Sequence, residues 1–244
     1  MKKKILALAL VVILAITAVA GASLAYLTDK DEAVNVMTLG NVDIEQYEKD
    51  RWGGAFVQEQ NLFPMVDLRG ESDPVMVDGL FNDAMKNVID KIVTVENTGN
   101  YAAYVRTIIA FETVIQYEEG TDKEINLHDI YIGVNGTFDY LYNEDGTVMV
   151  IEIDGTQYCL AVCTYENPVQ PGNSTTPSLK QFFMAPTANN EITALFGTTY
   201  EILCLSQAVQ AAGFETVGAE YALNAGFGKI TEATAQAWFE AIYN

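Results

Sequence analysis

Three two-residue turn signals between residues 130 and 165 constrain the fold most strongly. They are Asn135-Gly136, Asp145-Gly146 and Asp154-Gly155, each followed by threonine, and they separate segments in which apolar and polar residues alternate. Asn-Gly and Asp-Gly pairs favour tight hairpins, because both central positions of a type I′ turn need a positive φ angle. The stretch therefore predicts an antiparallel meander.

The same period-two alternation occurs elsewhere in the chain. It runs from Ile89 to Glu96, from Ala103 to Phe111 and from Tyr200 to Leu205. The tetrad Asn97 to Asn100 predicts a hairpin or tight connection between the first two of these strands. Because no long helical pattern separates the strands, we expect an all-β, jelly-roll-like antiparallel β-sandwich.

A few short helices are expected as additions to this sandwich. Gln207 to Ala212 reads as a short helix that ends at Gly213, and Thr231 to Tyr243 reads as an amphipathic helix with Thr231 as its N-cap. We therefore assign a helical C-terminal segment to residues 206–244. Residues 47–85 are interrupted by glycine and proline, which predicts an irregular insertion.

The N-terminus has the layout of a secretory signal peptide. Three lysines precede an apolar run from Ile5 to Ala20, and the small residues Ser23 and Ala25 follow. Cleavage after Ala25 removes residues 1–25 and leaves a secreted single domain, residues 26–244, that begins at Tyr26. The competing interpretation is an uncleaved anchor, since apolar character continues to Leu27. After cleavage, no stable membrane span is expected.

The charge balance excludes several partners. The chain has 13 basic and 33 acidic residues, and residues 1–25 carry three of the basic ones and no acid, so the processed chain has a formal charge of −23. Such a surface repels nucleic acid and anionic lipid. We therefore expect no nucleic-acid partner.

The sequence predicts no catalytic residue and no cofactor. His128 is the single histidine, which excludes the usual zinc sites built from two or three histidines in one chain. Calcium is a weaker expectation, because oxygen ligands gather in turns at Asn143, Glu144, Asp145 and Asp154 without the complete EF-hand pattern.

Three cysteines, Cys159, Cys163 and Cys204, allow at most one disulfide bridge; the favoured interpretation is three buried thiols. Several tyrosines in strand-like runs are candidate stacking platforms for a carbohydrate-binding module, although such rings more often belong to a core. These tyrosines are Tyr131, Tyr140, Tyr142 and Tyr158.

Patches spread over most of the chain resemble one family of secreted proteins, the TasA and camelysin (CalY) relatives of Gram-positive bacteria, which carry SipW-dependent signal peptides. The patches are Ala25-Tyr26-Leu27-Thr28-Asp29 with Asn35 and Gly40-Asn41-Val42-Asp43-Ile44, then Val93 to Gly99 with Ala103 to Arg106, then Gln207 to Phe214, Ala222-Leu223-Asn224 and Ala237-Trp238-Phe239.

The resemblance implies a jelly-roll subunit of extracellular, biofilm-matrix fibres. Each subunit would donate its N-terminal strand, within residues 26–46, to a neighbour by β-augmentation. Val34, Val36, Val42 and Ile44 lie on one face of that candidate strand, from Glu32 to Glu45. The alternative is pairing of this strand within its own chain.

Other partners and functions follow from the same resemblance. It implies a SipW-type signal peptidase as the processing enzyme and an accessory protein as the anchor, with the protein at the cell surface or in the extracellular matrix. Camelysin relatives are also described as metallopeptidases, an activity that the lone His128 disfavours. A third possibility is a cell-surface adhesin or a carbohydrate- or protein-binding module.

Overall fold

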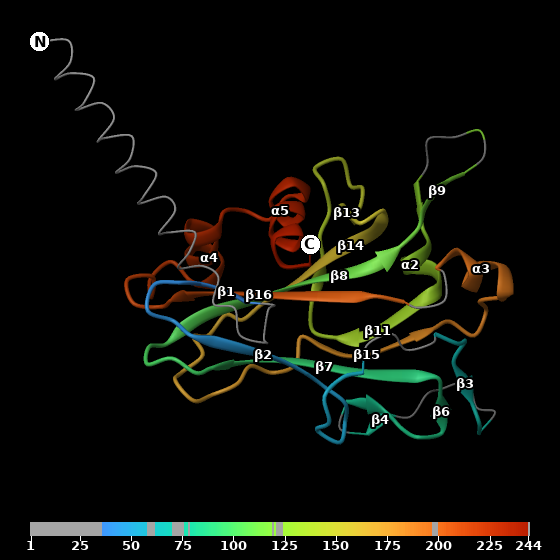
Figure 1. Cartoon of the computed structure of the whole chain (residues 1–244), viewed down its shortest axis with the longest axis horizontal. Helices are drawn as coiled ribbons and strands as arrows, with labels where there is room; N and C mark the ends of the chain where they lie inside the picture. Colours follow the sequence, from blue (N-terminus) through green and yellow to red (C-terminus); the bar gives the residue numbers. More distant parts are fainter. Residues whose placement is uncertain are drawn as a thin grey trace, which may run out of the picture.

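The computed structural model describes residues 36–57, 62–69, 76–77, 79–118, 120, 124–196 and 200–243. Two β-sheets lie one above the other, and short helices flank them (Figure 1). The expected all-β sandwich is confirmed. Ser23, Ala25, Tyr26 and Val34 lie outside the described residues, as do the other parts of the signal segment.

One sheet has six strands and the other has four. The six-stranded sheet has the order β1 (Val36–Leu39), β16 (Ile202–Gln210), β8 (Ala103–Thr113), β14 (Thr156–Thr164) and β12 (Asp139–Tyr140), with β13 (Val150–Ile153) also paired to β14. The four-stranded sheet has the order β11 (Ile132–Gly136), β15 (Leu179–Met184), β7 (Val88–Asn97) and β2 (Ile44–Lys49).

The remaining elements are short. Three two-stranded ladders pair β3 (Val66–Asp67) with β6 (Met85–Lys86), β4 (Met76–Val77) with β5 (Leu80–Phe81), and β9 (Ile115–Tyr117) with β10 (Glu124–Asn126). Among the described residues, the helices are α2 (Leu127–Tyr131), α3 (Asn190–Leu195), α4 (Ala219–Phe227) and α5 (Glu232–Tyr243).

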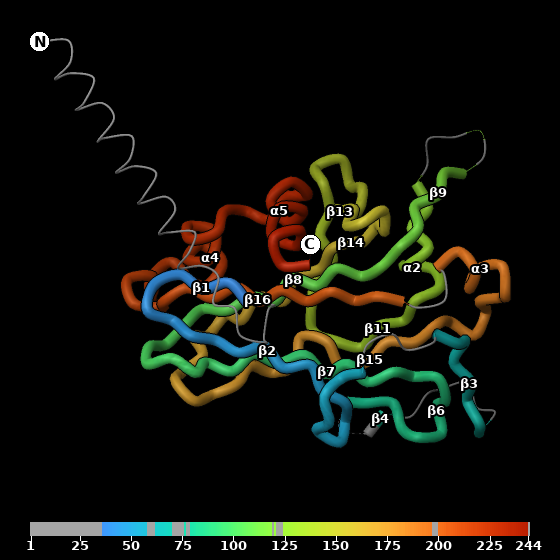
Figure 2. Tube along the Cα trace, viewed as in Figure 1, coloured from blue at the N-terminus to red at the C-terminus, as the bar shows by residue number. Residues whose placement is uncertain are grey.

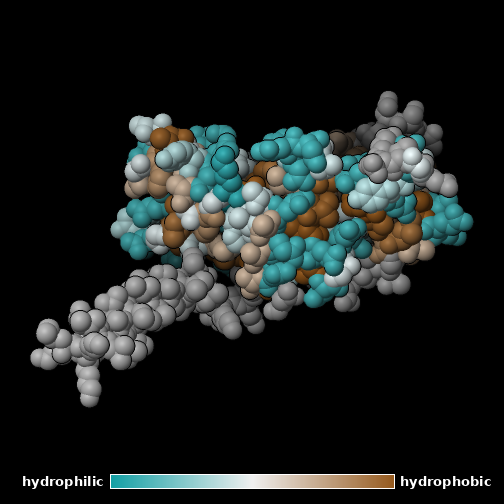
Figure 3. Space-filling view, turned by 90° about the horizontal axis from the view of Figure 1, so that it is seen from above, coloured by the Kyte–Doolittle hydropathy of each residue, from teal (hydrophilic) through white to brown (hydrophobic). Residues whose placement is uncertain are grey.

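Strand β8 is buried along its whole length, because both faces of the six-stranded sheet are covered there. Its inner face meets the four-stranded sheet, where Ile109 and Phe111 share a core with Phe182. On its outer face, Ile108 packs in one cluster with Phe239 of α5. Seen from the side of α4 and α5, the surface mixes hydrophilic and hydrophobic side chains (Figure 3).

The turn signals have mixed outcomes. Asp154 and Gly155 adopt φ angles of 50° and 84° and join β13 to β14, as a type I′ hairpin requires. Gly146, with a φ of 86°, closes a tight turn from Asn143 to Thr147. Asn135 and Gly136, however, lie at a register shift inside β11, which pairs with β15 in the other sheet. The single meander is therefore wrong at its first turn.

The Asn97 to Asn100 tetrad joins β7 to β8, which belong to different sheets, so of the two expected alternatives it is the tight connection and not the hairpin. The helix expected from Gln207 to Ala212 is wrong. Residues 207–210 belong to strand β16 and not to a helix, because they pair with β8 along the whole ladder. The helices of the C-terminal segment begin only at Ala219, and Thr231 Oγ1 accepts the Thr234 backbone N–H at 3.2 Å beside α5.

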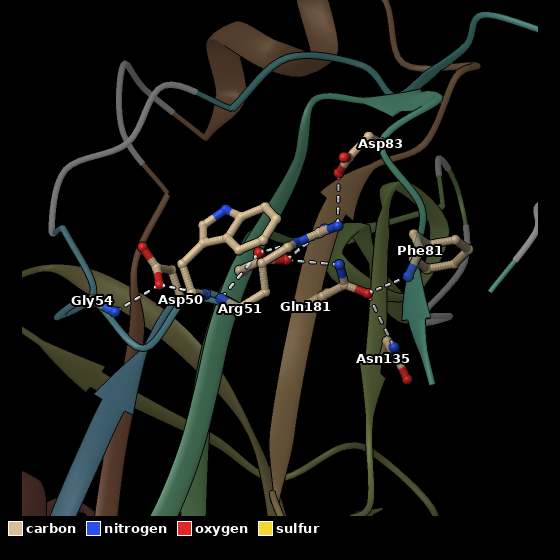
Figure 4. Close-up of polar contacts among 9 residues, drawn as sticks. Asp50, Arg51, Gly54, Phe81, Asp83, Asn135 and Gln181 are labelled. Atoms are coloured by element: carbon tan, nitrogen blue, oxygen red, sulfur yellow. Dashed lines mark hydrogen bonds and ion pairs between the residues drawn. The ribbon is translucent and has the colours of Figure 1, made fainter. Parts of the chain in front are cut away.

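Arg51 ties the segment from residue 47 to 85 to the four-stranded sheet (Figure 4). Its guanidinium donates to Asp90 Oδ1 at 2.9 Å and to Asp83 Oδ1 at 3.0 Å. Gln181 donates to Asp90 at 2.7 Å and accepts the Phe81 backbone N–H at 2.8 Å. Burial raises the pKa of Asp90, but the hydrogen bonds from Arg51 and Gln181 outweigh that effect and hold the pKa below its usual value.

Candidate functional site

Strand β1 lies at one edge of the six-stranded sheet and pairs in parallel with β16. Four residues form the ladder, from Val36 opposite Ser206 to Leu39 opposite Val209. Every other ladder among the described strands is antiparallel. A parallel pair needs a long connection, so no local loop holds β1 against β16.

The side chains of β1 alternate between two faces of the sheet. Val36 packs against the core cluster that contains Val42 and Ile44. Met37 packs on the opposite, helix-covered side, and its sulfur accepts a hydrogen bond from Gln207 Nε2 at 3.5 Å. Leu39 lies so close to α4 that a Cβ added at Gly226 would meet its Cδ2 at 3.0 Å. Strand β1 therefore packs closely against the core on one face and against the helix-covered side on the other, at the edge of the six-stranded sheet.

The expected single strand from Glu32 to Glu45 is wrong within the described residues. After Leu39, Gly40 adopts a φ of +89°, and the chain passes from the six-stranded sheet to β2 of the four-stranded sheet (Figure 2). Asp43 O accepts the Thr98 and Gly99 backbone N–H groups at 3.0 Å each. These hydrogen bonds hold the chain in place just before β2 begins. Val36 and Ile44 are therefore in different strands, although they share one core cluster.

His128 lies in helix α2, in the interior of the protein. It is fully buried in α2, and its Nδ1 and Nε2 each lie 2.7 Å from a tyrosine hydroxyl, of Tyr200 and Tyr140 respectively. Burial lowers the pKa of His128 to about 3, so the ring stays neutral at physiological pH. With both nitrogens occupied, the imidazole pins α2 to the six-stranded sheet rather than facing a substrate.

A surface cavity is lined by residues on either side of His128 in the sequence, from β10 and α2. It has a volume of about 310 Å³ and is lined by Glu124, Asn126, Asp129, Tyr142, Asp145, Gly146, Thr147 and Val148. The β10–α2 segment forms one wall and the turn between Tyr142 and Val148 forms the other. Asp145 Oδ1 accepts the Thr147 backbone N–H at 3.0 Å, which stabilises that turn. Sequence reasoning missed this cavity, because its walls come from separate segments.

The calcium ligands expected from sequence do not assemble into one site. Asn143 Nδ2 donates to Thr147 and to Glu232, Asp145 caps its own turn, and Asp154 lies in a different hairpin. Among the residues that the structure describes, no group of three or more histidine, cysteine or acidic side chains is arranged to hold a metal ion.

The cysteines are free thiols and all three are buried, in agreement with the favoured interpretation. Burial raises the pKa of Cys159 to about 12, so its thiol is not a nucleophile at neutral pH. The tyrosines do not form a row of exposed rings: Tyr158 is buried, Tyr131 and Tyr140 are partly buried, and Tyr142 is 55% exposed at the cavity.

A buried row of polar side chains between the sheets was also missed. Lys91 is 1% exposed and forms an ion pair with Glu48, and its Nζ lies 4.2 Å from the centre of the Phe56 ring. Gln46 accepts a hydrogen bond from Ser206 Oγ at 2.7 Å. The alternation of inward and outward residues along β7 could have predicted that Lys91 is buried, because Lys91 falls on the same face as the buried Val93.

No family model, no curated protein and no solved structure matches this chain. Within the described part of the chain, none of the helices is long and apolar enough to cross a membrane.

Proposed function

We propose that this protein is a secreted structural subunit of extracellular fibres in a biofilm matrix, and that subunits assemble when β1 of one chain takes the place of β1 in its neighbour. The main observation that supports this proposal is the short parallel ladder between β1 and β16 at the edge of the six-stranded sheet. The resemblance to the TasA and camelysin family supports the biological setting, with a SipW-type peptidase and an anchor protein as further partners.

Exchange of β1 between two chains should cost little free energy. An exchanged strand makes the same hydrogen bonds to Ser206 through Val209 and fills the same position beside Gly226, so each interaction of β1 within one chain has an equivalent between two chains. Gly40 already has a φ of +89°, a conformation that glycine tolerates, and it stands between β1 and the rest of the chain. It is the natural hinge for such an exchange.

We propose no enzymatic activity. The single histidine is enclosed between Tyr140 and Tyr200, and its pKa of about 3 makes it a poor base at neutral pH. A metallopeptidase site of the usual kind would need that histidine as an accessible ligand. Protease activity that survives His128→Ala would contradict this part of the proposal.

The test locks β1 into its own chain. Thr38 and Ala208 are directly paired in the β1–β16 ladder, so a Thr38→Cys/Ala208→Cys variant places two thiols at a spacing that suits a disulfide. Under oxidising conditions the mature chain, residues 26–244, should stay monomeric in negative-stain microscopy and in ultracentrifugation. After reduction it should form filaments as the unmodified chain does.

The single variants Thr38→Cys and Ala208→Cys are the matched controls, and both should form filaments in either redox state. A second arm uses a chain that starts at Gln46 and so lacks β1; it should bind to filament ends without extending them. Filaments from the oxidised double variant would show that assembly does not use β1. Absence of filaments from the unmodified chain across pH, salt and calcium would refute spontaneous polymerisation.

A further inference from the structure

Helix α4 lies against the edge of the six-stranded sheet that β1 occupies (Figure 1). Met37 and Leu39 of β1 both point toward this helix-covered side. Met37 lies opposite Gln207 in the parallel ladder. Two residues further on, Leu39 lies opposite Val209. The side chains of α4 and of the neighbouring strands therefore decide which residues fit at these two positions of β1.

The space beside Leu39 exists because residue 226 is a glycine. A Cβ atom built on Gly226 would lie 3.0 Å from Leu39 Cδ2, which is well inside the roughly 3.5–4.0 Å at which carbon atoms attract each other best. Gly226 does not have a positive φ angle, and glycine inside a helix such as α4 lowers stability relative to alanine. The room that it leaves for the partly exposed Leu39 explains why glycine stands there.

At position 37 the sheet presents a hydrogen-bond donor. Arg106 Nε donates to Gln207 Oε1 at 2.8 Å, and a guanidinium can only donate. The Gln207 amide is thereby oriented with its NH₂ group toward Met37, whose sulfur accepts at 3.5 Å. Gln207 is fully buried, so an aliphatic residue at position 37 would leave this donor without an acceptor. Position 37 therefore favours methionine over leucine or isoleucine.

Arg106 is a positioning residue that connects α4 to the Gln207 amide. Its Nη1 donates to Asn224 Oδ1 on α4 at 2.8 Å, and its Nη2 donates to Gly228 O at 3.2 Å. Its guanidinium also lies 5.5 Å from the centre of the Trp238 ring on α5. Burial lowers the pKa of Arg106 to about 10, so the side chain stays charged at neutral pH. None of these contacts involves β1, so they hold α4 and Gln207 in place whichever strand lies at the edge.

We infer that Gly226 and the Arg106–Gln207 pair form a selectivity site, which admits to the β16 edge an extended segment with methionine at one position and leucine two residues later. In this chain that segment is β1, so the partner is a second copy of the chain. Gly226 selects the side chain at position 39 by its size, and Gln207 selects the side chain at position 37 by its acceptor atom. This role rests on the proposed exchange of β1 and specifies which strands can take part in it.

The test uses two complementary variants of the mature chain, residues 26–244. Gly226→Val fills the space that Leu39 needs, and Leu39→Ala removes the side chain that needs it. In either variant alone, β1 fits poorly both in its own chain and in an identical neighbour. In a mixture, the shortened strand can meet the filled site and the unmodified strand can meet the unmodified site. Matched contacts then exist only between unlike chains.

Equal amounts of the two variants are unfolded in urea, refolded together and measured by analytical ultracentrifugation. We expect complexes with equal numbers of both chains, at a concentration about tenfold below that needed by either variant alone. The double variant Gly226→Val/Leu39→Ala restores the match within one chain and should fold and behave as the wild type does. Gly226→Ala in place of Gly226→Val should give the same preference in weaker form.

Ala225→Val is the matched control, because it adds the same side chain at an exposed position of the same helix. Its mixture with Leu39→Ala should form no more complexes than either chain alone, since neither site is filled. A preference of the same size in this mixture would show that the space at Gly226 is not what selects the strand.

A labelled peptide of residues 34–43 tests position 37 on the full Gly226→Val chain, whose own β1 is loosely held. The peptide with Leu39→Ala should bind in fluorescence anisotropy more tightly than the unmodified peptide. The further change Met37→Leu in this peptide should weaken binding about tenfold, because Gln207 Nε2 loses its acceptor. Equal binding of the peptides with and without Met37→Leu would overturn the role of Gln207.

The mixture of Gly226→Val and Leu39→Ala separates this selectivity from fibre formation. Complexes of unlike chains, together with a wild type that stays monomeric, would support the selectivity site and refute spontaneous fibre assembly. Wild-type filaments that the Thr38→Cys/Ala208→Cys disulfide blocks, without a preference for unlike chains in the mixture, would support exchange of β1 and overturn the selectivity site. Absence of any complex in the mixture would overturn it as well.

Discussion

Glu112 makes the stability of this protein depend on pH between about 4.5 and 7. The residue is 8% exposed on β8, and its Oε2 accepts the Glu201 backbone N–H at 2.6 Å. Burial raises the pKa of Glu112 from 4.5 to about 7, and the charge of Glu201 adds to the increase. Because the folded-state pKa is the higher one, the favourable contribution is present below pH 4.5 and is lost as pH rises through 7.

The size of this effect follows from the shift. A difference of about 2.5 pKa units corresponds to about 3 kcal/mol, since one unit is worth about 1.4 kcal/mol. Glu201 is exposed, so water screens part of the interaction, and we expect roughly 2 kcal/mol less stability at pH 8 than at pH 5 from this one group. Glu112→Gln keeps an oxygen acceptor for the Glu201 N–H and removes the ionisation.

Urea unfolding of the wild type and the Glu112→Gln variant, followed by tryptophan fluorescence from pH 5 to pH 8, measures the difference. The variant should become more stable relative to the wild type as pH rises, by roughly 2 kcal/mol across that range. Glu144→Gln removes the same charge from an exposed turn and should give a curve parallel to the wild type. If the Glu112→Gln and wild-type curves are also parallel, Glu112 does not have the raised pKa and this reasoning is wrong.

Three further changes test core packing, the Lys91–Glu48 ion pair and the backbone of one turn. Phe239→Ala removes a fully buried ring between α5 and the six-stranded sheet and should cost about 3–5 kcal/mol in urea unfolding, whereas exposed Glu240→Ala should stay within about 0.5 kcal/mol. Lys91→Met leaves the partly buried carboxylate of Glu48 without its cation and should cost about 3 kcal/mol, but Lys91→Met/Glu48→Leu should recover most of that loss in the same assay. Gly155→Ala places a side chain at a φ of 84° and should lower the free energy of unfolding by about 1–2 kcal/mol, without changing the far-UV circular dichroism.

The fold class was predictable because turn chemistry and alternation agree over most of the chain. Asp154-Gly155 forms the expected hairpin, because both residues adopt the positive φ angles that a type I′ turn needs. Gly136 also follows a turn-forming residue in the sequence, but glycine is needed there for another reason. A Cβ there would lie 2.5 Å from Ser178 O, so glycine is needed for the close approach of β15 and not for a turn. A local pattern cannot distinguish those two reasons.

Residues 207–210 show how tertiary pairing overrides local propensity. Alanine and glutamine favour a helix, yet these residues complete a nine-residue ladder with β8. The cavity was beyond sequence reasoning for a similar reason. Asn126 and Tyr142 come together only because His128, between them in sequence, reaches Tyr140 in β12 and Tyr200 just before β16. The residue types at this site are visible in the sequence, but long-range contacts decide which of them meet.

In the proposed assembly β1 would both complete a monomer and join two monomers, and its position in the chain suits both roles. It is separated from its partner β16 by almost the whole described chain, and after Gly40 it continues into β2 of the opposite sheet. Tension applied through β1 would therefore reach β2 first. There, six paired residues on β7 and the buried Glu48–Lys91 ion pair oppose separation. A subunit joined through β1 would thus transmit force into β2, an edge strand that is held by its ladder with β7 and by this ion pair.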